Sequence, residues 1–162
     1  MSHRLIRLEM PVFPDRRMFR VHDSRVDPDA PGGPLAPVGT LVSANRDQLW
    51  VGSLQENVGV RITIEEWDAA PPLFADAWED EAKATLYLRG EISVDRAVDR
   101  LTLAGGVGDY VARVYARNRR EVQRLYEELF DRGVDPLSDE FQRARQDLEG
   151  LEQYLLQFWR EY

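Results

Sequence analysis

Alternation of apolar and polar side chains is the feature that most limits how this chain can fold. Every second residue is apolar or aromatic in residues 58–65, and residues 82–89 and 110–117 repeat the pattern. Successive side chains of a β-strand point to opposite faces, so each segment predicts a strand with one buried face. Several such segments, separated by turn residues, predict a mainly β protein.

The segment YLLQFW, residues 154–159, is apolar on both faces of a strand apart from Gln157. A strand that is covered on both faces belongs in the middle of a sheet. We therefore expect this segment to be the last strand and a central one, paired with residues 110–117, and not a hydrophobic tail.

Between these two strands the apolar period changes to that of a helix. Four residues follow the i, i+3, i+4, i+7 spacing of one helix face: Val122, Leu125, Tyr126 and Leu129. Gly133 is placed to end this helix. Asp135 before Pro136 is typical of an N-cap that starts a second helix, which runs to about Gly150. Residues 119–150 are therefore predicted to form a helical hairpin inserted before the last strand.

Shorter signals complete the predicted fold. Residues 5–13 and 18–22 are expected to form a hairpin-like start, and residues 40–44 and 48–54 further strands. The glycine-rich residues 104–109 predict a turn, and residues 27–39, with four prolines and three glycines, a surface loop. The 162 residues fit a single domain. The predicted architecture is an antiparallel β-sandwich with a two-helix insertion before the last strand.

Composition restricts the function classes. The formal net charge of −8 disfavours binding to nucleic acid or to an anionic membrane and favours a basic protein partner. No stretch approaches the roughly 20 apolar residues that span a bilayer, and the first residues lack a signal-peptide core, so we expect a cytoplasmic protein. Cysteine is absent and His3 and His22 lie far apart in sequence, so no metal site, cofactor or thiol chemistry is predicted. No catalytic motif is present, which predicts a protein that is not an enzyme.

GDYVARVYARNRREV, residues 108–122, and the closing YLLQFW carry a resemblance. They resemble a group of small uncharacterised actinobacterial proteins with a Gly-x-Tyr-x-x-Arg-Val strand, an Ala-Arg-x-x-(Asp/Glu) exit and a closing Tyr-Leu-Leu-Gln-Phe-Trp. The acidic EEWDAAPP, residues 65–72, and Trp78 also resemble that group. The group usually closes with Trp-Pro and has a short loop before its last strand, where this chain has Trp159-Arg160 and two predicted helices.

The resemblance to that group implies a fold and no particular activity, and it does not extend to residues 1–39. More remotely, the strand pattern is similar to that of the competence-associated nuclease inhibitors. These are small sandwich proteins that bind and block a nuclease, so the remote similarity implies an inhibitor.

The most suggestive functional feature is a run of seven carboxylates without a basic residue in residues 65–81. Aromatic anchors inside an acidic rim suit a binding surface for a basic protein, because the aromatic rings supply affinity and the charges speed encounter. The predicted contact residues are Glu65, Glu66, Trp67, Asp68, Asp76, Trp78, Glu79, Asp80 and Glu81. The alternative is a solvated loop whose tryptophans cover the edge of the core.

These features favour a non-catalytic protein-binding module, most like an immunity or inhibitor protein for a basic toxin or nuclease. One alternative is a small-ligand or carbohydrate-binding sandwich, or a hydrolase on such a fold, with Trp50, Trp67 or Trp78 as a stacking platform. The other is a structural homo-oligomer, for example a homodimer, in which the helix face that starts at Val122 packs against its own copy.

Overall fold

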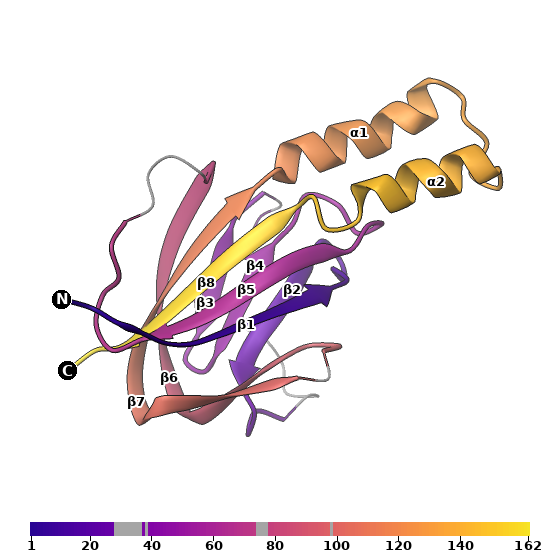
Figure 1. Cartoon of the computed structure of the whole chain (residues 1–162). Coiled ribbons are helices and arrows are strands. Elements are labelled where there is room, and N and C mark those ends of the chain that lie inside the picture. The colour runs from indigo at the N-terminus through magenta and orange to yellow at the C-terminus, as the bar shows by residue number, and fades with distance from the viewer. Residues whose placement is uncertain (28–36, 38, 74–77, 98) are drawn as a thin grey trace.

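The computed structural model describes residues 1–27, 37, 39–73, 78–97 and 99–162. Within these residues the chain forms eight strands and two helices (Figure 1). In chain order they are β1 (Arg4–Val12), β2 (Met18–Asp23), β3 (Val42–Asn45), β4 (Gln48–Gly52), β5 (Val60–Trp67), β6 (Asp80–Val94), β7 (Arg100–Arg117), α1 (Arg119–Asp131), α2 (Asp139–Leu148) and β8 (Gln153–Arg160).

The strands form one sheet in the order β1-β5-β8-β7-β6-β2-β4-β3. The prediction of a mainly β fold with two helices before the last strand is confirmed. Neighbouring strands run antiparallel, as expected, with one departure: β5 and β8 run parallel. β8 returns from the helices antiparallel to β7. Its other neighbour is β5, which runs in the same direction as β8, so these two strands form a parallel pair.

This parallel pair determines the path of the connection between β5 and β6. The two strands run in the same direction with β8 and β7 between them, so their connection must start and finish at opposite ends of the sheet. We call the described residues of this connection, 68–73 and 78–79, the crossover. The Arg113 guanidinium on the outer face of β7 donates to the Pro71 carbonyl at 3.2 Å, and the Trp78 ring lies 6.0 Å from the ring of Tyr115. The crossover therefore explains why Arg113 and Tyr115 are buried although they point away from the main core.

The sheet curls so that its two halves enclose one main core, as the layers of a sandwich do. The rings of Phe19 on β2 and Tyr154 on β8 meet edge to face with centroids 5.1 Å apart, although β7 and β6 separate these strands in the sheet. Figure 1 shows the long strands β6 and β7 bending at the end of the molecule away from the helices. The alternating apolar residues fill the enclosed space, and Ile62, Leu88 and Leu156 are fully buried there.

The closing segment lies where the sequence predicts it. β8 is placed between β5 and β7, and all of residues 154–159 are buried. It pairs with residues 110–117 of β7, from Tyr110 opposite Arg160 to Arg117 opposite Gln153. The prediction of a central last strand is confirmed.

The glycine-rich residues 104–109 do not form the predicted turn. They lie within β7, and the pairing with β6 shifts so that residues 103–106 are opposite Gly90 alone. This is a bulge that bends the strand, and Gly106 there has a φ of 69°, which glycine adopts without a steric penalty. The prediction was wrong because bulges and turns use the same residue types.

The predicted hairpin at the start of the chain is also wrong. β1 pairs with β5, whereas β2 pairs with β4 and β6 in the other half of the curled sheet. Arg16 and Arg17 have φ values of 54° and 64°, and this turn carries the chain from one half to the other. β3 and β4 do pair with each other, as their sequence predicts. Most of the loop predicted at residues 27–39 lies outside the described residues.

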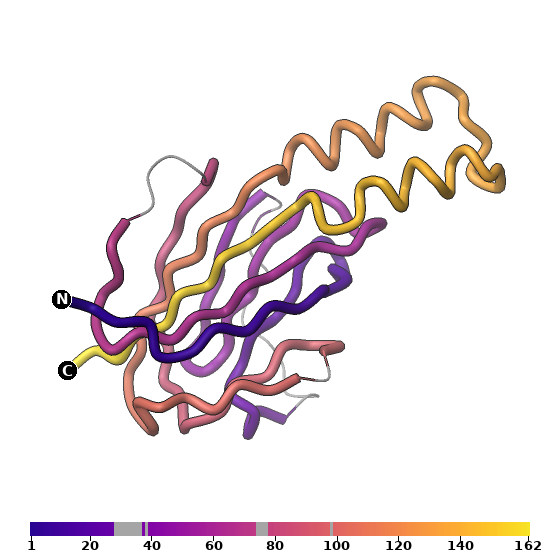
Figure 2. Tube along the Cα trace, viewed as in Figure 1, coloured from indigo at the N-terminus to yellow at the C-terminus, as the bar shows by residue number. Residues whose placement is uncertain are grey.

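The helices form a hairpin that extends beyond one end of the sheet, and Figure 2 shows both chain termini at the opposite end of the molecule. α1 ends just before Gly133, as predicted. The N-cap of α2 is Ser138, not Asp135, and its hydroxyl accepts a hydrogen bond from the Phe141 amide at 3.1 Å. The base of the hairpin packs on the sheet through a second, smaller core of Val58, Val122 and Leu148.

Candidate functional site

The predicted acidic stretch, residues 65–81, spans the end of β5, the crossover and the start of β6. Its members therefore have different surroundings, some under the crossover and some on its outer side. Asp76 lies outside the described residues. The other eight predicted contact residues can be placed individually.

Glu65 is buried and has three partners within the chain. Its carboxylate accepts hydrogen bonds from the Arg4 guanidinium at 3.0 Å, the Trp67 indole at 3.1 Å and the Gln157 amide at 3.0 Å. Only 4% of Glu65 is exposed. Its prediction as a contact residue is therefore wrong, because a carboxylate committed to three internal donors is not available to a partner.

Glu66 is also buried, on the opposite face of β5, and it fixes the bulge of β7. Its two carboxylate oxygens accept hydrogen bonds from the backbone amides of Ala104 and Gly105, at 2.7 Å and 2.8 Å. The Tyr110 hydroxyl donates to the carbonyl of Gly106 at 2.8 Å, and burial, with the charge of Glu66, raises the pKa of Tyr110 to about 12. A side chain at position 105 would place its Cβ 2.6 Å from that hydroxyl. The role of Glu66 is structural, and its prediction as a contact residue is wrong.

The exposed or half-buried carboxylates of the stretch have basic or amide partners. Asp68 contacts His3 and Glu79 accepts from the amide of Asn118, while the guanidinium groups that face Asp80 and Glu81 come from β7 and α1. These guanidinium groups belong to Arg113, Arg119 and Arg120. Asp68, Glu79 and Glu81 nevertheless remain exposed. These neighbouring positive charges partly offset the carboxylates, so the local electrostatic potential is less negative than the sequence of the stretch indicates.

The tryptophans of the stretch are half-buried. The Trp78 ring has Tyr115 on one side and the Arg117 guanidinium 4.6 Å from its centroid, and the Trp67 indole N–H is bound to Glu65. These contacts occupy part of the aromatic surface of both side chains. They therefore do not favour the alternative of a carbohydrate-binding protein, in which the rings would stack on a sugar.

The helix face proposed for self-association is covered within the chain. Val122 and Leu129 are buried, with exposed fractions of 0% and 3%. Leu125 and Tyr126 pack on the second core, which Val58 and Leu148 complete. Two of the four residues of this face are therefore buried within the chain, and the other two are half-buried.

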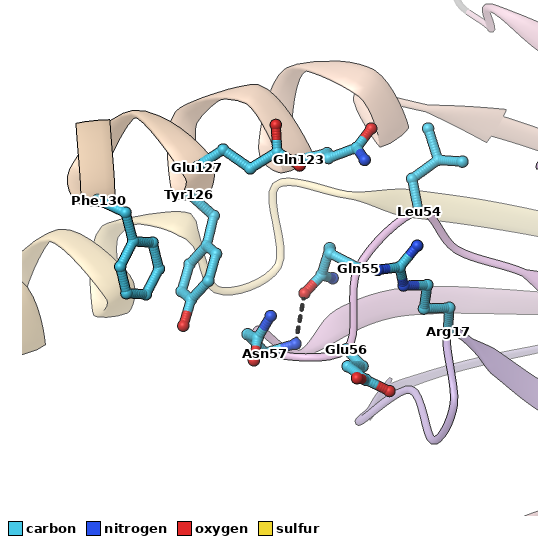
Figure 3. Close-up of a pocket in the computed structure, with 9 residues that line it drawn as sticks. All are labelled: Arg17, Leu54, Gln55, Glu56, Asn57, Gln123, Tyr126, Glu127 and Phe130. Atoms are coloured by element: carbon cyan, nitrogen blue, oxygen red, sulfur yellow. Dashed lines mark hydrogen bonds between the residues drawn. The ribbon is translucent and has the colours of Figure 1, made fainter. Parts of the chain in front are cut away.

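A groove that the sequence did not indicate lies between α1 and residues 54–57, the start of the loop between β4 and β5 (Figure 3). Its volume is about 130 Å³. Figure 3 shows Tyr126 and Phe130 extending side by side from α1, with Tyr126 between Phe130 and this loop. The lining residues are Arg17, Leu54, Gln55, Glu56, Asn57, Gln123, Tyr126, Glu127 and Phe130.

The floor of the groove is fixed by the buried side chain of Gln55. Its amide oxygen accepts from the backbone amides of Asn57 and Val58, both at 2.8 Å. Its amide nitrogen donates to the Val58 carbonyl at 2.9 Å and to Glu152 at 3.1 Å. Glu152 in turn accepts from the Tyr154 hydroxyl. Burial raises the pKa of Glu152, and the hydrogen bonds that it accepts offset part of this rise.

In residues 1–27, 37, 39–73, 78–97 and 99–162, no three histidine or acidic residues are grouped so that they could hold a metal ion. In the same part of the chain, neither helix has the length and hydropathy needed to cross a membrane.

Comparison with known proteins defines the class of fold. No family model matches the chain, and no curated protein matches it. Solved structures do share its fold over the whole chain. At the sequence identities given below, this likeness is evidence of a common fold.

One of these structures is ComJ from Bacillus subtilis, described as an inhibitor of the DNA-degrading activity of NucA. It superposes with a TM-score of 0.55 at 12% identity, over 99% of each chain. Another is the product of crocagin biosynthetic gene J, with a TM-score of 0.52 at 12% identity, over 100% of this chain and 99% of the other. The likeness to ComJ agrees with the remote resemblance to nuclease inhibitors inferred from the strand pattern.

Proposed function

We propose that this chain is a non-catalytic protein-binding module that inhibits a basic toxin or nuclease. The observation that carries the proposal is the fold shared with ComJ from end to end, with 99% of both chains covered. A nuclease must attract the phosphate backbone, so its binding surface is basic. A chain with a net charge of −8 suits such a partner.

The contact surface that we propose is the outer side of the acidic stretch. It consists of Trp67, Asp68, Trp78, Glu79, Asp80 and Glu81. Glu65 and Glu66 are left out because they are buried. Exposed carboxylates at the rim of an interface mainly raise the association rate, and their effect decreases with salt.

The direct test is inhibition of DNA degradation. The proteins encoded beside the gene for this chain would be purified, and their nuclease activity measured with increasing amounts of the chain. We expect one of them to degrade DNA and to be inhibited at a one-to-one ratio. If none of the neighbouring products, and no basic nuclease from a panel that includes NucA, binds the chain, the proposal is wrong.

Charge reversal tests the surface. Asp68→Lys combined with Glu79→Lys is expected to weaken binding of the inhibited nuclease about tenfold at low salt. Asp80 and Glu81 are left intact because they pair with the buried Arg119 and Arg113. The matched control reverses two exposed acids of α2, Glu140→Lys with Asp147→Lys. Equal losses in both variants would show that net charge, and not this surface, determines binding.

A further inference from the structure

We propose that the chain forms a twofold-symmetric dimer in which the free edge of β1 pairs with the β1 edge of a second copy. This inference is independent of the proposed function. It is carried by three observations on β1: an unpaired edge with a short open stretch, charges that complement their own copy, and an apolar side that is incompletely covered.

The first observation is the unpaired edge of β1. β1 is the first strand in the sheet order, and among the described elements β5 alone runs along it. The Arg61 amide of β5 donates to the carbonyl of Glu152, directly before β8, at 3.0 Å. Pro11 is opposite Arg61, so this pair is without hydrogen bonds and the backbone groups of Pro11 point to the free edge. Those of Arg7 and Glu9 also point there, because the direction alternates along a strand.

The open stretch of this edge has a defined centre. On one side a bulge shifts the pairing with β5 between Arg4 and Ile6, and on the other side Pro11 has no N–H to donate. Both features interrupt strand pairing at an edge, so residues 6–10 are the stretch that a further strand can reach. Its midpoint is Leu8. A twofold axis at Leu8 would make the same surface of both copies meet.

The second observation is that the charges of this stretch select the same register. Arg7 and Glu9 have exposed side chains, which form an ion pair at 2.7 Å within one copy. An antiparallel twofold about Leu8 places Arg7 opposite Glu9 of the second copy at both symmetric positions, with two backbone hydrogen bonds at each. The four charges then alternate in sign.

The neighbouring registers are unfavourable. A shift by one two-residue strand repeat places Arg7 opposite Arg7 or Glu9 opposite Glu9 of the second copy. Opposite charges directly across a strand pair stabilise it, and like charges destabilise it. The edge is thus complementary to itself in one register, and a second copy is the partner that it fits.

The third observation is the incomplete cover of the inner face of β1. Met10 is buried in the main core, whereas Leu8 is half-buried and Ile6 is 37% exposed. In the proposed register Leu8 meets Leu8 of the second copy, and Ile6 lies opposite Met10. The dimer would therefore remove apolar surface from water on the inner face while the charges pair on the outer face.

The first test is sedimentation velocity of the full chain and its charge variants. We expect the unmodified chain to show a monomer–dimer equilibrium. Arg7→Glu and Glu9→Arg each place like charges opposite each other and should weaken dimerisation about tenfold, whereas the double variant should dimerise like the unmodified chain. Glu127→Arg, at an exposed position of α1, is the control and should have no effect. A chain that stays monomeric at millimolar concentration, or a dimer equally stable in all variants, would overturn the proposal.

A single cysteine tests the register, because the chain contains none. In the proposed dimer the two copies of residue 8 face each other in a pair without hydrogen bonds, with Cα atoms about 4.5 Å apart, which a disulfide can bridge. Leu8→Cys should therefore form a disulfide-linked dimer on oxidation faster than Leu137→Cys, although Leu137 is 91% exposed. Equal rates would contradict the dimer. Neither measurement uses a nuclease, so the dimer and the proposed function can fail separately.

Discussion

At the scale of single residues, internal partners decide which acidic groups are available for function. Glu65 and Glu66 are neighbours in sequence but lie on opposite faces of β5, where one meets Gln157 and the other the backbone of the β7 bulge. Two bonds from backbone amides satisfy the buried carboxylate of Glu66. Such a group stabilises the fold only while its donors and acceptors remain matched.

Replacing Glu66 should destabilise the protein in proportion to the bonds lost. Glu66→Ala removes the acceptor for two amides and should lower the free energy of unfolding by about 2–4 kcal/mol, while Glu66→Gln keeps one acceptor and should cost about 1–2 kcal/mol. Urea denaturation monitored by circular dichroism measures both. The control is Glu127→Gln, at an exposed position of α1, expected within about 0.5 kcal/mol of the unmodified chain. Equal stability of all three variants would contradict the bulge-fixing role.

A second residue-scale prediction concerns pH and Glu152. Burial raises the pKa of Glu152 above its ordinary value of 4.5, so the unfolded chain releases this proton at a lower pH than the folded chain does. Between the two pKa values the unfolded state binds fewer protons, and the free energy of unfolding falls as pH rises. Glu152→Gln cannot titrate. The stability of this variant relative to the unmodified chain should therefore increase as pH is raised from 4 through the folded pKa.

The measurement is urea denaturation of both proteins across that pH range. The difference between the two curves removes the contribution of all other titrating groups, which the proteins share. Glu149→Gln is the control for a nearby carboxylate with less burial. A pH-independent difference, or one that changes in the opposite direction, would contradict the raised pKa of Glu152.

At the scale of elements, β7 and β8 connect the sheet to the helical hairpin. Arg117 on β7 is paired with Gln153 on β8, so the hairpin enters and leaves the sheet at adjacent positions. Among the described residues, those of the main core all come from outside α1 and α2. β7 and β8 pair with each other at the base of the hairpin. Residues 119–150 can therefore be regarded as an insertion between two neighbouring strands.

The sheet is therefore expected to fold without the hairpin. Replacing residues 118–152 by Asn-Gly leaves the strands joined by a two-residue turn, which suits an antiparallel pair. The product should keep its β-type circular dichroism and unfold cooperatively, but lose roughly 3–6 kcal/mol because the buried Val122 and Leu148 are removed. A product without cooperative unfolding would mean that the hairpin belongs to the folding unit.

At the scale of the whole molecule, the fold depends on its last strand. β8 joins β5 and β1 on one side to β7 and the rest of the sheet on the other. Its buried residues also contact the opposite layer, through the ring of Tyr154 on Phe19. In the part of the chain that the structure describes, β5 and β7 are joined in the sheet through β8.

Removal of residues 153–162 should therefore abolish folding. We expect the truncated chain to show no cooperative thermal transition and to be degraded rapidly by limited proteolysis. The control removes only Glu161 and Tyr162, which are exposed, and should keep the melting temperature within a few degrees of the full chain. A folded product after the longer truncation would contradict the central role of β8.

Local patterns in the sequence predicted much of this architecture. Period-2 alternation identified β5, β6 and β7, the two-faced apolar segment identified β8 as central, and helical spacing located α1 and α2. These signals are readable because a strand or helix repeats its environment at a fixed interval. The candidate groove had no such signal, because its walls come from residues 54–57 and from α1, more than 60 positions later.

The sequence by itself determined the elements, the last strand's place in the sheet and the negative charge of the chain. Only the tertiary structure decided that β5 and β8 run parallel, that Pro71 and Trp78 contact the outer face of β7, and that Glu65 and Glu66 are buried. The physical reason is that periodicity reports which face of an element is buried. It does not report which distant backbone amide or guanidinium group will meet a given carboxylate.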